Sequence, residues 1–232
     1  MDVPKRIRVV SASREAEADF RTGTALGRSL SLYRSELPMV ELRLFGKNTR
    51  GLSAVYNEAI AECTGDPAIL LFVHDDLHIC DFYWVEQIYL ALQMFDIIGV
   101  AGNKRRVPNQ PGWAFVDTNL TWDAMENLSG VVGHGKGFPP TTLSVYGPPL
   151  QEVKLLDGLL LACSSNTLRK SGLKFDEQFA FDFYDMDFCR QAEIKNLRMG
   201  TCKLSVVHES VGRFRREDWR AAYGTYLRKW GS

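Results

Sequence analysis

Two acidic clusters are the residues of this chain whose types and spacing could do chemistry. Residues 72–76 (Phe-Val-His-Asp-Asp) end an apolar run, and residues 181–187 (Phe-Asp-Phe-Tyr-Asp-Met-Asp) lead into a helical pattern. In α/β proteins, ligands bind beyond the carboxyl ends of strands and at the N-termini of helices. Carboxylates in both places predict a divalent cation together with a carboxylate base, which suits a metal-dependent transferase acting on a phosphorylated donor.

Both clusters also have a structural interpretation, because acidic residues commonly cap helices. Asp76 or Asp81 could start the helix expected after Phe82, and Asp182 could cap the later helix with Asp185 in its first turn. The aromatic residues interleaved with the second cluster favour the functional interpretation, since they exclude water from a carboxylate and raise its pKa. A base that works near neutral pH needs such a raised pKa.

Two other segments carry side chains that could meet a substrate. His208 ends a β-branched run, and it could supply a third metal ligand, although a lone histidine at a strand end is more often structural. Residues 130–137 resemble a phosphate-binding P-loop, but Gly137 replaces the Ser or Thr that holds Mg²⁺ and prolines follow at once. We therefore exclude a nucleoside triphosphatase and expect a flexible loop, in which His134 and Lys136 could contact substrate.

The C-terminal residues 213–230 combine basic side chains with Trp219, Tyr223, Tyr226 and Trp230 in a helical pattern. We expect a helix docked on the domain with a solvated charged face. The alternative is a peripheral membrane contact that would bring the site near a lipid-linked acceptor.

Length and composition bound the class of protein. The chain has 232 residues with 28 basic and 28 acidic side chains, and this balance argues against a nucleic-acid partner. The five cysteines form no C-x-x-C pair, which indicates reduced thiols in a cytoplasmic protein. We expect no signal peptide and no transmembrane segment, because no apolar run approaches the roughly 20 residues that a membrane helix requires.

Hydrophobic periodicity predicts strands that alternate with helices, as in an α/β domain with a mostly parallel sheet and helices on both faces. Strands are expected at 7–11, 40–45, 68–73, 97–101, 153–161 and 201–208. Helices are expected at 15–33, 52–63, 82–95, 186–196 and 217–230. Residues 103–149 are rich in Gly, Pro and Asn, and we expect them to be a weakly structured functional segment of a single domain.

A series of motifs in order makes the chain resemble the family 2 glycosyltransferases of GT-A fold, especially a bacterial glycosyltransferase-like branch. The resemblance runs from about residue 48 to residue 212. Its motifs are Gly51 with residues 56–59 (Tyr-Asn-Glu-Ala), the metal motif at 72–76, residues 156–158 (Leu-Asp-Gly), 175–177 (Phe-Asp-Glu), 183–190 and 207–212. Two departures stand out: His74 occupies the first position of the usual aspartate-x-aspartate, and Tyr184 replaces an acidic residue before the base.

The resemblance implies an inverting glycosyltransferase that uses a nucleotide-diphospho sugar, a UDP-sugar by expectation, with Mn²⁺ or Mg²⁺. It implies a Rossmann-like GT-A domain with a donor half (1–102), an acceptor and catalytic half (103–212) and a C-terminal amphipathic helix (213–232). The acceptor would be a glycan or lipid-linked molecule of a surface-polysaccharide pathway. The expected site residues are Asp185 as base; Asp76, His74 and His208 on the metal; Ser11, Arg14, Asn57 and Asp75 on the donor; and Asp157, Gly158, Trp113 and Asp187 on the acceptor.

Two rival functions remain open on the sequence. One is a relative without activity that binds only a nucleotide or a glycan. The other is a metal-dependent hydrolase or phosphotransferase built from the same carboxylates.

Overall fold

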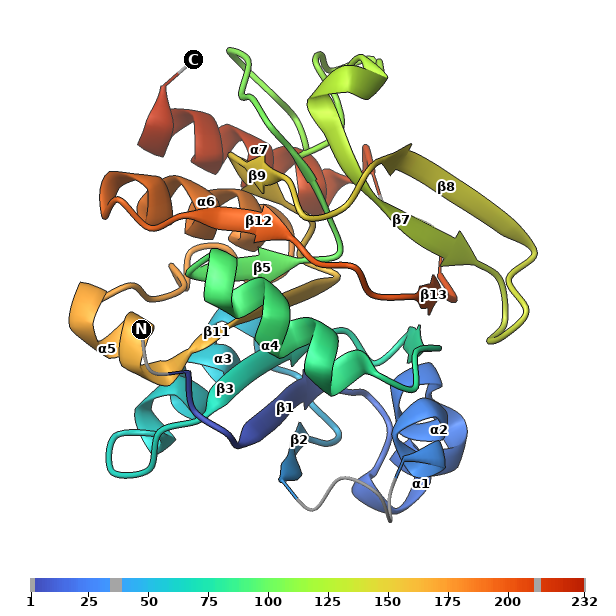
Figure 1. Ribbon diagram of the computed structural model, residues 1–232. Helices are drawn as coiled ribbons and strands as arrows, with labels where there is room; N and C mark the ends of the chain where they lie inside the picture. Colours follow the sequence, from blue (N-terminus) through green and yellow to red (C-terminus); the bar gives the residue numbers. More distant parts are fainter. Residues whose placement is uncertain (1–2, 34–38, 211–213, 232) are drawn as a thin grey trace.

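A seven-stranded sheet forms the centre of the computed structural model, which describes residues 3–33, 39–210 and 214–231 (Figure 1). In spatial order its strands are β2 (Val40–Phe45), β1 (Ile7–Ala12), β3 (Ile69–Val73), β11 (Leu160–Ser164), β5 (Ile97–Gly99), β12 (Met199–Thr201) and β9 (Glu152–Val153). The strands expected at 7–11, 40–45 and 68–73 are confirmed. The strand expected at 153–161 is divided among β9, β10 (Leu155–Leu156) and β11.

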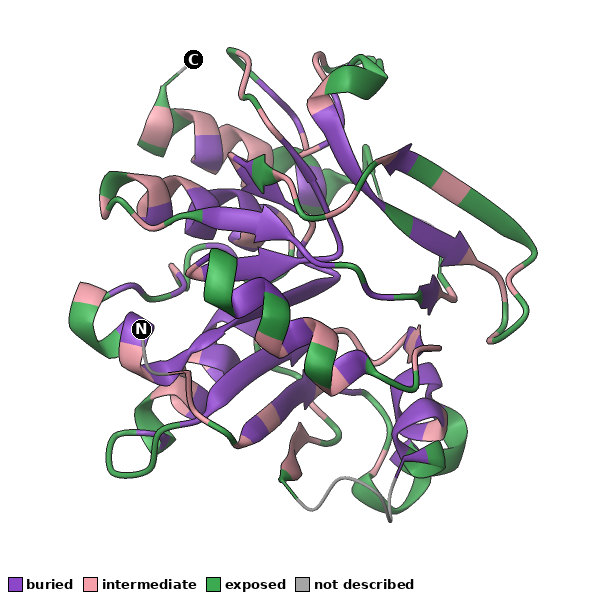
Figure 2. Ribbon diagram, in the orientation of Figure 1, coloured by how far each residue is buried: buried purple, intermediate pink, exposed green. Residues whose placement is uncertain are grey.

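Helices cover both faces of this sheet, and the residues of β3 alternate between the two cores. Ile69 and Leu71 pack with helices α1 (Glu17–Gly23), α2 (Ala25–Leu32) and α4 (Trp84–Met94). Leu70 and Phe72 pack on the other side with α3 (Leu52–Glu62), α5 (Ser165–Ser171), α6 (Tyr184–Ile194) and α7 (Glu217–Trp230). All five residues of β3 are buried, as its continuous apolar run predicts, and Figure 2 shows the buried strands between partly exposed helices.

The main sheet is mixed rather than mostly parallel. β1 runs parallel to both β2 and β3, but β11 runs antiparallel to β3 and to β5. In the register of β11 with β3, Leu160 pairs with Val73. Because an antiparallel strand begins where its neighbour ends, residues 157–159 lie beside the carboxyl end of β3, and His74 donates its backbone N–H to the carbonyl of Leu159.

A second sheet includes part of the segment 103–149, which was expected to be weakly structured. Its strands are β10, β6 (Ala101–Asn103), β7 (Leu128–His134), β13 (Val206–His208) and β4 (Leu77–Ile79), with β8 (Thr142–Gly147) paired to β7. The expectation was wrong for 128–147 because glycines hide the strand pattern. Gly130 has a φ of +107°, and a Cβ there would lie 2.1 Å from the carbonyl oxygen of Val100. The stretch resembling a P-loop is therefore largely strand β7.

The helices expected at 52–63, 82–95, 186–196 and 217–230 are confirmed with ends within two residues. The helix expected at 15–33 is instead two helices, because the Thr24 hydroxyl accepts a hydrogen bond from the Gly27 N–H and starts α2 anew. Asp182 is not the N-cap of α6, because Phe183 holds that position with a φ of +65°. Residues 211–213, part of the closing motif and of the basic segment, lie outside the described residues.

Helix α7 docks on the domain through its aromatic side. Trp219 and Tyr226 are buried, and Trp219 and Tyr223 both pack against Phe183. Because these rings face the protein, they are not presented to a bilayer, and the docked-helix interpretation is the one that fits. Among the described residues no helix combines the length and apolarity needed to cross a membrane.

Asp187 joins α6 to the end of α7. Its side chain is fully buried and accepts a hydrogen bond of 2.7 Å from the Trp230 indole, and it pairs with the Lys229 ammonium at 2.6 Å. Lys229 also pairs with Asp176 at 2.6 Å. Asp187 was expected to bind the acceptor, but its carboxylate instead contacts Trp230 and Lys229 of α7. It does not line either of the cavities described below for the candidate site.

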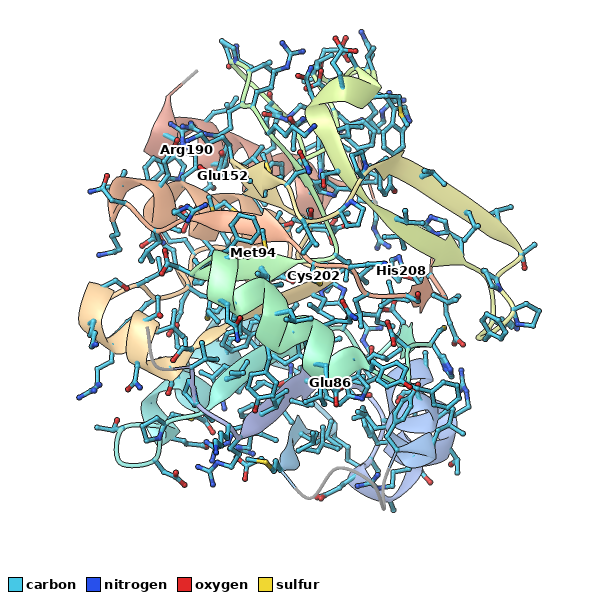
Figure 3. All side chains as sticks on the ribbon, in the orientation of Figure 1. Glu86, Met94, Glu152, Arg190, Cys202 and His208 are labelled. Atoms are coloured by element: carbon cyan, nitrogen blue, oxygen red, sulfur yellow. The ribbon has the colours of Figure 1, made fainter. Side chains whose placement is uncertain are left out.

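Asp187→Asn should therefore act on stability. We expect the free energy of unfolding to fall by about 2 kcal/mol, less than for a fully orphaned buried ion because Lys229 keeps Asp176. Urea denaturation measures the effect. Glu152→Gln, which breaks the exposed pair of Glu152 (labelled in Figure 3) with Arg198, is the control and should cost no more than about 0.5 kcal/mol. Equal effects of the two changes would contradict the structural role of Asp187.

Candidate active site

Four segments from distant parts of the chain converge at the carboxyl end of β3. His74 and Asp76 follow β3 directly, and His208 ends β13, where Figure 3 labels it. β13 pairs antiparallel with β4 so that His208 lies opposite Leu77, which brings its ring beside Asp76. The loop before β11 and the first turn of α6 complete the site, because β11 and α6 both begin at this edge.

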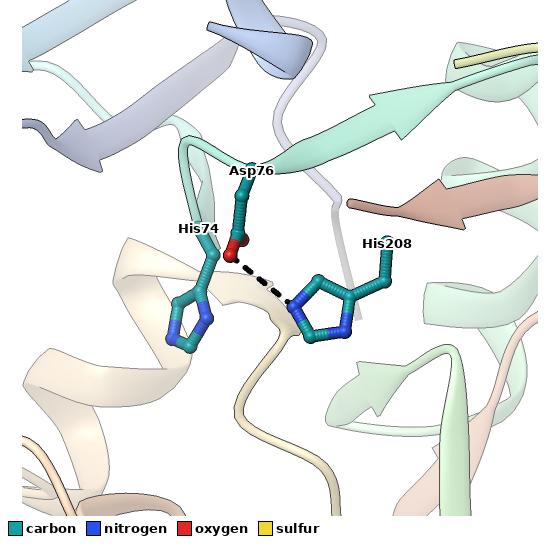
Figure 4. Close-up of side chains that lie close together, drawn as sticks. All are labelled: His74, Asp76 and His208. Atoms are coloured by element: carbon teal, nitrogen blue, oxygen red, sulfur yellow. Dashed lines mark ion pairs between the residues drawn. The ribbon is translucent and has the colours of Figure 1, made fainter. Parts of the chain in front are cut away.

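His74, Asp76 and His208 form a group that could hold a metal ion. One potential ligand atom from each lies within 4.8 Å of the others, and Nε2 of His208 is 3.3 Å from Oδ2 of Asp76 (Figure 4). The other oxygen of Asp76, Oδ1, is buried and has no hydrogen-bond partner among the described residues. A buried acceptor without a donor is costly, and a bound cation would satisfy it. These residues therefore fit a divalent metal.

The electrostatic environment differs among the three residues of this group. Burial opposes the ionised form of Asp76, but the hydrogen bond from His208 and the nearby imidazoles outweigh it and lower the pKa of Asp76. Burial likewise opposes the charged form of His208, yet the contact with Asp76 raises the pKa of that ring. For His74, burial dominates and lowers the pKa, so His74 is neutral at pH 7 and has a lone pair to offer a metal.

Tyr184 determines which nitrogen of His74 carries that lone pair. The Tyr184 hydroxyl is 2.6 Å from the carbonyl oxygen of Gly158 and 2.9 Å from Nε2 of His74. A carbonyl can only accept, so the single hydroxyl hydrogen goes to Gly158, and Nε2 of His74 must donate to the tyrosine oxygen. Neutral His74 then has its proton on Nε2 and a free lone pair on Nδ1, which is how an outer hydrogen bond orients a metal ligand.

Gly158 connects the metal side of the site to Asp185. Its carbonyl accepts from Tyr184, and its N–H donates to Oδ2 of Asp185 at 2.9 Å. A Cβ at this position would lie 2.4 Å from the Tyr184 oxygen and 3.0 Å from Cβ of Asp185. Only glycine leaves room for both contacts, which explains the Asp-Gly pair before β11.

Asp185 has the properties of a general base. Burial raises its pKa most, the charge of Asp157 adds to the effect, and together they outweigh the backbone N–H groups of Met186 and Gly158 to give a pKa of about 7. The carboxylate lies in the first turn of α6 and is half-buried. A carboxylate with a pKa near the working pH is suited to take a proton from a hydroxyl group.

Two cavities meet at His74 and Asp76. The first, of about 350 Å³, contains Asp157, Gly158 and Asp185, and its remaining wall is largely aromatic: Trp113, Phe115, Trp122, Tyr146, Phe181, Phe183, Tyr184, Phe214 and Trp219. The second, of about 930 Å³, lies on the β1 side between the segments 12–15, 47–52, 74–76 and 180–182, with Ser210 and Asp218. The first is hereafter the inner aromatic cavity. The second is hereafter the basic cavity, after its residues Arg14, Lys47 and Arg50, and its lining also includes the acidic residues Glu15, Asp75, Asp76, Asp182 and Asp218.

The expected donor residues divide between the basic cavity and the structure around it. Arg14 and Asp75 line the cavity. Ser11 is fully buried within β1. Ser13, just after the end of that strand, lines the cavity instead and forms a hydrogen bond with Asp75. Asn57 does not line it, because its amide bonds both the N–H and the carbonyl of Phe175 and so ties α3 to the segment before α6.

The expected acceptor residues Trp113, Asp157 and Gly158 all line the inner aromatic cavity. Three further rings of this cavity, Phe115, Trp122 and Tyr146, come from the segment expected to be weakly structured. Phe181 belongs to the second acidic cluster, whose aromatic residues the sequence had already indicated, and its ring stacks on that of His74 with the centroids 5.7 Å apart. His134, which the sequence suggested could contact substrate, also lines this cavity, and its Nε2 lies 2.9 Å from the hydroxyl oxygen of Ser144. Lys136 lines neither cavity.

Solved structures share this fold, whereas the sequence matches no protein-family model and no curated protein. The catalytic domain of Drosophila beta1,4-galactosyltransferase 7, in complex with xylobiose, matches with a TM-score of 0.51 and 8% identity over 91% of this chain and 73% of that chain. A197 from STIV matches with a TM-score of 0.50 and 10% identity over 91% of this chain and 99% of that one. S. aureus TarS (residues 1–349) matches with a TM-score of 0.46 and 14% identity over 89% of this chain and 59% of that chain.

The fold is that of the GT-A glycosyltransferases: a mixed α/β domain whose central sheet ends at the candidate site. The expected fold is thereby confirmed. At identities this low the likeness shows the fold alone, so membership of family 2 stays a prediction.

The role given to Tyr184 predicts a change that can be measured without any substrate. In Tyr184→Phe, His74 loses the acceptor that holds its proton on Nε2, so Mn²⁺ affinity should fall about 10- to 100-fold. Electron paramagnetic resonance of free Mn²⁺ measures the affinity, and long-range ¹H–¹⁵N correlation spectra of the metal-free protein report the His74 tautomer.

Tyr56→Phe is the matched control. Tyr56 is buried in the same core, 6.0 Å from the Tyr184 ring, and its hydroxyl has no hydrogen-bond partner among the described residues. We expect unchanged Mn²⁺ affinity and an unchanged His74 tautomer in this variant. If Tyr184→Phe behaves like Tyr56→Phe in both measurements, the hydroxyl of Tyr184 does not orient His74.

Proposed function

We propose that this protein is a metal-dependent inverting glycosyltransferase that moves a sugar from a nucleotide-diphospho sugar, a UDP-sugar, to a hydroxyl group of a glycan or lipid-linked acceptor. The observation that carries the proposal is the meeting of two cavities at His74 and Asp76, with the raised pKa of Asp185 on one side only. Such an arrangement lets a donor and an acceptor approach each other across a metal ion. The proposed location is the cytoplasm.

The basic cavity is the proposed donor site. Arg14 and Lys47 make no ion pair with described residues, and Arg50 pairs with Glu58 at 2.8 Å. Such cations suit the oxygens of a diphosphate. We propose that Mn²⁺ or Mg²⁺ binds Asp76 with His74 and His208, where it would stabilise the negative charge that develops on the leaving diphosphate.

The inner aromatic cavity is the proposed acceptor site. Its rings offer flat apolar faces to a sugar, and Asp157 offers a hydrogen-bond acceptor for a hydroxyl group. Asp185 would take the proton from the attacking hydroxyl group of the acceptor. At the same time the hydroxyl oxygen would form a bond to the anomeric carbon, and the bond from that carbon to the diphosphate would break. Attack from the face opposite the leaving group inverts the anomeric configuration.

The proposal largely keeps the division of the chain into a donor half at 1–102 and an acceptor half at 103–212. Residues 180–182 and Ser210 are the exceptions, because they line the basic cavity although they belong to the second half. They lie between the two sites, next to the metal group, which is where a donor sugar would have to be presented to an acceptor.

The donor site can be tested by thermal unfolding with a panel of nucleoside diphosphates, with and without Mn²⁺. UDP with Mn²⁺ at about 100 times its Kd should add about 2.7 kcal/mol, which raises the melting temperature by roughly 5–10 °C for a chain of this size. We expect Asp76→Asn and His208→Gln to lose the metal-dependent part of the shift. His78→Gln is the control and should retain it, because His78 lines neither cavity.

The absence of a shift with any nucleotide, from a folded protein, would remove the transferase proposal. Free sugar or phosphate formed without an acceptor, far above background, would instead favour the metal-dependent hydrolase or phosphotransferase. Binding without any product would favour a relative that only binds.

The pKa of Asp185 predicts the pH dependence of the transfer. Because Asp185 must be ionised to act as base, kcat should fall about tenfold per pH unit below pH 7 and level off above it. Asp157→Asn removes the neighbouring charge that helps to raise the pKa of Asp185, so the fall should move to lower pH. Release of UDP from the nucleotide sugar found in the screen measures kcat. Asp185→Asn should retain UDP binding and lose turnover. An unchanged pH profile of kcat in Asp157→Asn would argue against Asp185 as the base.

A further inference from the structure

A third cavity lies next to the inner aromatic cavity. It has a volume of about 420 Å³ and is lined by Thr118, Asn119, Arg215, Trp219, Arg220 and Tyr223. From this cavity, hereafter the arginine subsite, we infer that the acceptor is at least two sugar residues long and carries an anionic group, a sulfate, phosphate or carboxylate, on the residue farther from the reacting hydroxyl. The inference rests on the proposed function, since it extends the proposed acceptor site.

Trp219 lines both cavities, so they lie next to each other. The same two stretches of chain form their walls: residues 111–122 on one side and the segment from Phe214 to Tyr223 on the other. The Phe115 and Phe214 rings contact each other across this division at 5.2 Å, and the Arg215 guanidinium donates to the backbone carbonyl of Asn119. Because one indole lines both cavities, a ligand longer than one sugar ring would be able to contact both.

The charge of the arginine subsite selects the chemistry of its ligand. The side chain of Arg220 is exposed and makes no hydrogen bond or ion pair with the described residues. The positive charge of Arg215 is partly offset by the carboxylate of Asp117, with which it interacts electrostatically. That carboxylate already accepts hydrogen bonds from the backbone N–H groups of Asn119 and Thr121. Guanidinium groups bind sulfate, phosphate and carboxylate oxygens in a bidentate manner. An anionic group is thus the ligand that this subsite fits.

The inner aromatic cavity has the opposite preference, which orients the acceptor. Asp157 and Asp185 both face that cavity, and an anion there would be repelled by their carboxylates. The stacked rings of Trp219 and Tyr223, 5.5 Å apart, continue the aromatic wall into the arginine subsite. A neutral sugar residue therefore enters first, with its hydroxyl group toward Asp185, and the anionic group remains at the outer end.

The test compares neutral disaccharides with their monosulfated forms, beginning with lactose and lactose 3′-sulfate, by isothermal titration of the protein with UDP and Mn²⁺ present. The sulfated sugar should bind about fivefold more tightly, and its advantage should shrink as salt rises. Arg220→Gln should abolish the advantage and Arg220→Lys should retain part of it. Arg228→Gln, an exposed arginine in the last turn of the same helix, is the matched control and should leave the advantage intact.

Three results would overturn the inference: equal affinity for the two forms throughout the panel, no binding of either form, or an advantage that survives in Arg220→Gln. The proposed function fails separately, because the thermal shift with UDP and Mn²⁺ does not involve Arg220. Sulfate-dependent binding without that shift would mean that the arginine subsite exists on a protein that is not a transferase.

Discussion

The Gly158 peptide is the interaction on which the rest of the site depends. Its carbonyl takes the hydrogen of Tyr184, which leaves the tyrosine oxygen to hold His74, and its N–H holds Asp185. The antiparallel pairing of β11 with β3 is what brings this peptide to the end of β3. A parallel neighbour would have begun at the opposite edge of the sheet, so the reversed strand is the feature of the sheet that joins the candidate metal group to Asp185, the proposed base.

The same strands also give two carboxylates opposite electrostatic environments. Asp76 lies beside His208, across the β4–β13 pairing, and this partner lowers its pKa despite burial. Asp185 is half-buried near the carboxylate of Asp157, and the loss of solvent together with that negative charge raises its pKa to about 7. Neither carboxylate could exchange its proposed role with the other, since a metal ligand must remain ionised and a base must be able to accept a proton. The pairing of strands, rather than the acidic residues alone, separates these roles.

Much of this arrangement could be predicted from local sequence, because it depends on strands and helices with strong periodicity. The apolar run of β3 predicted where His74 and Asp76 would lie, and the start of α6 predicted the position of Asp185. Contacts between distant segments could not be predicted in the same way. Asp187 has the same spacing and charge as a site residue, yet α7 folds back and occupies its carboxylate.

The aromatic wall and the basic cavity show a second limit of local patterns. The strands that carry Tyr146 and His134 contain glycines where two backbones approach closely, so their sequence resembles a loop. Ser11 and Ser13 lie on the same side of an extended segment. Ser11 is buried inside β1, whereas Ser13 follows the end of the strand and lines the cavity. Tertiary packing fixes such details, and no single-residue propensity records them.

The composition of the metal group has a consequence for the ion that it would bind. With His74 where relatives by resemblance have aspartate, the group offers two imidazole nitrogens and a single carboxylate. Mg²⁺ prefers oxygen ligands, whereas Mn²⁺ also accepts imidazole, so the substitution favours Mn²⁺. It also removes one negative charge from the wall that the diphosphate of the proposed donor would approach. The neutral, Nε2-protonated His74 that Tyr184 enforces is therefore consistent with a site in which the donor's phosphates supply the oxygen ligands that the protein lacks.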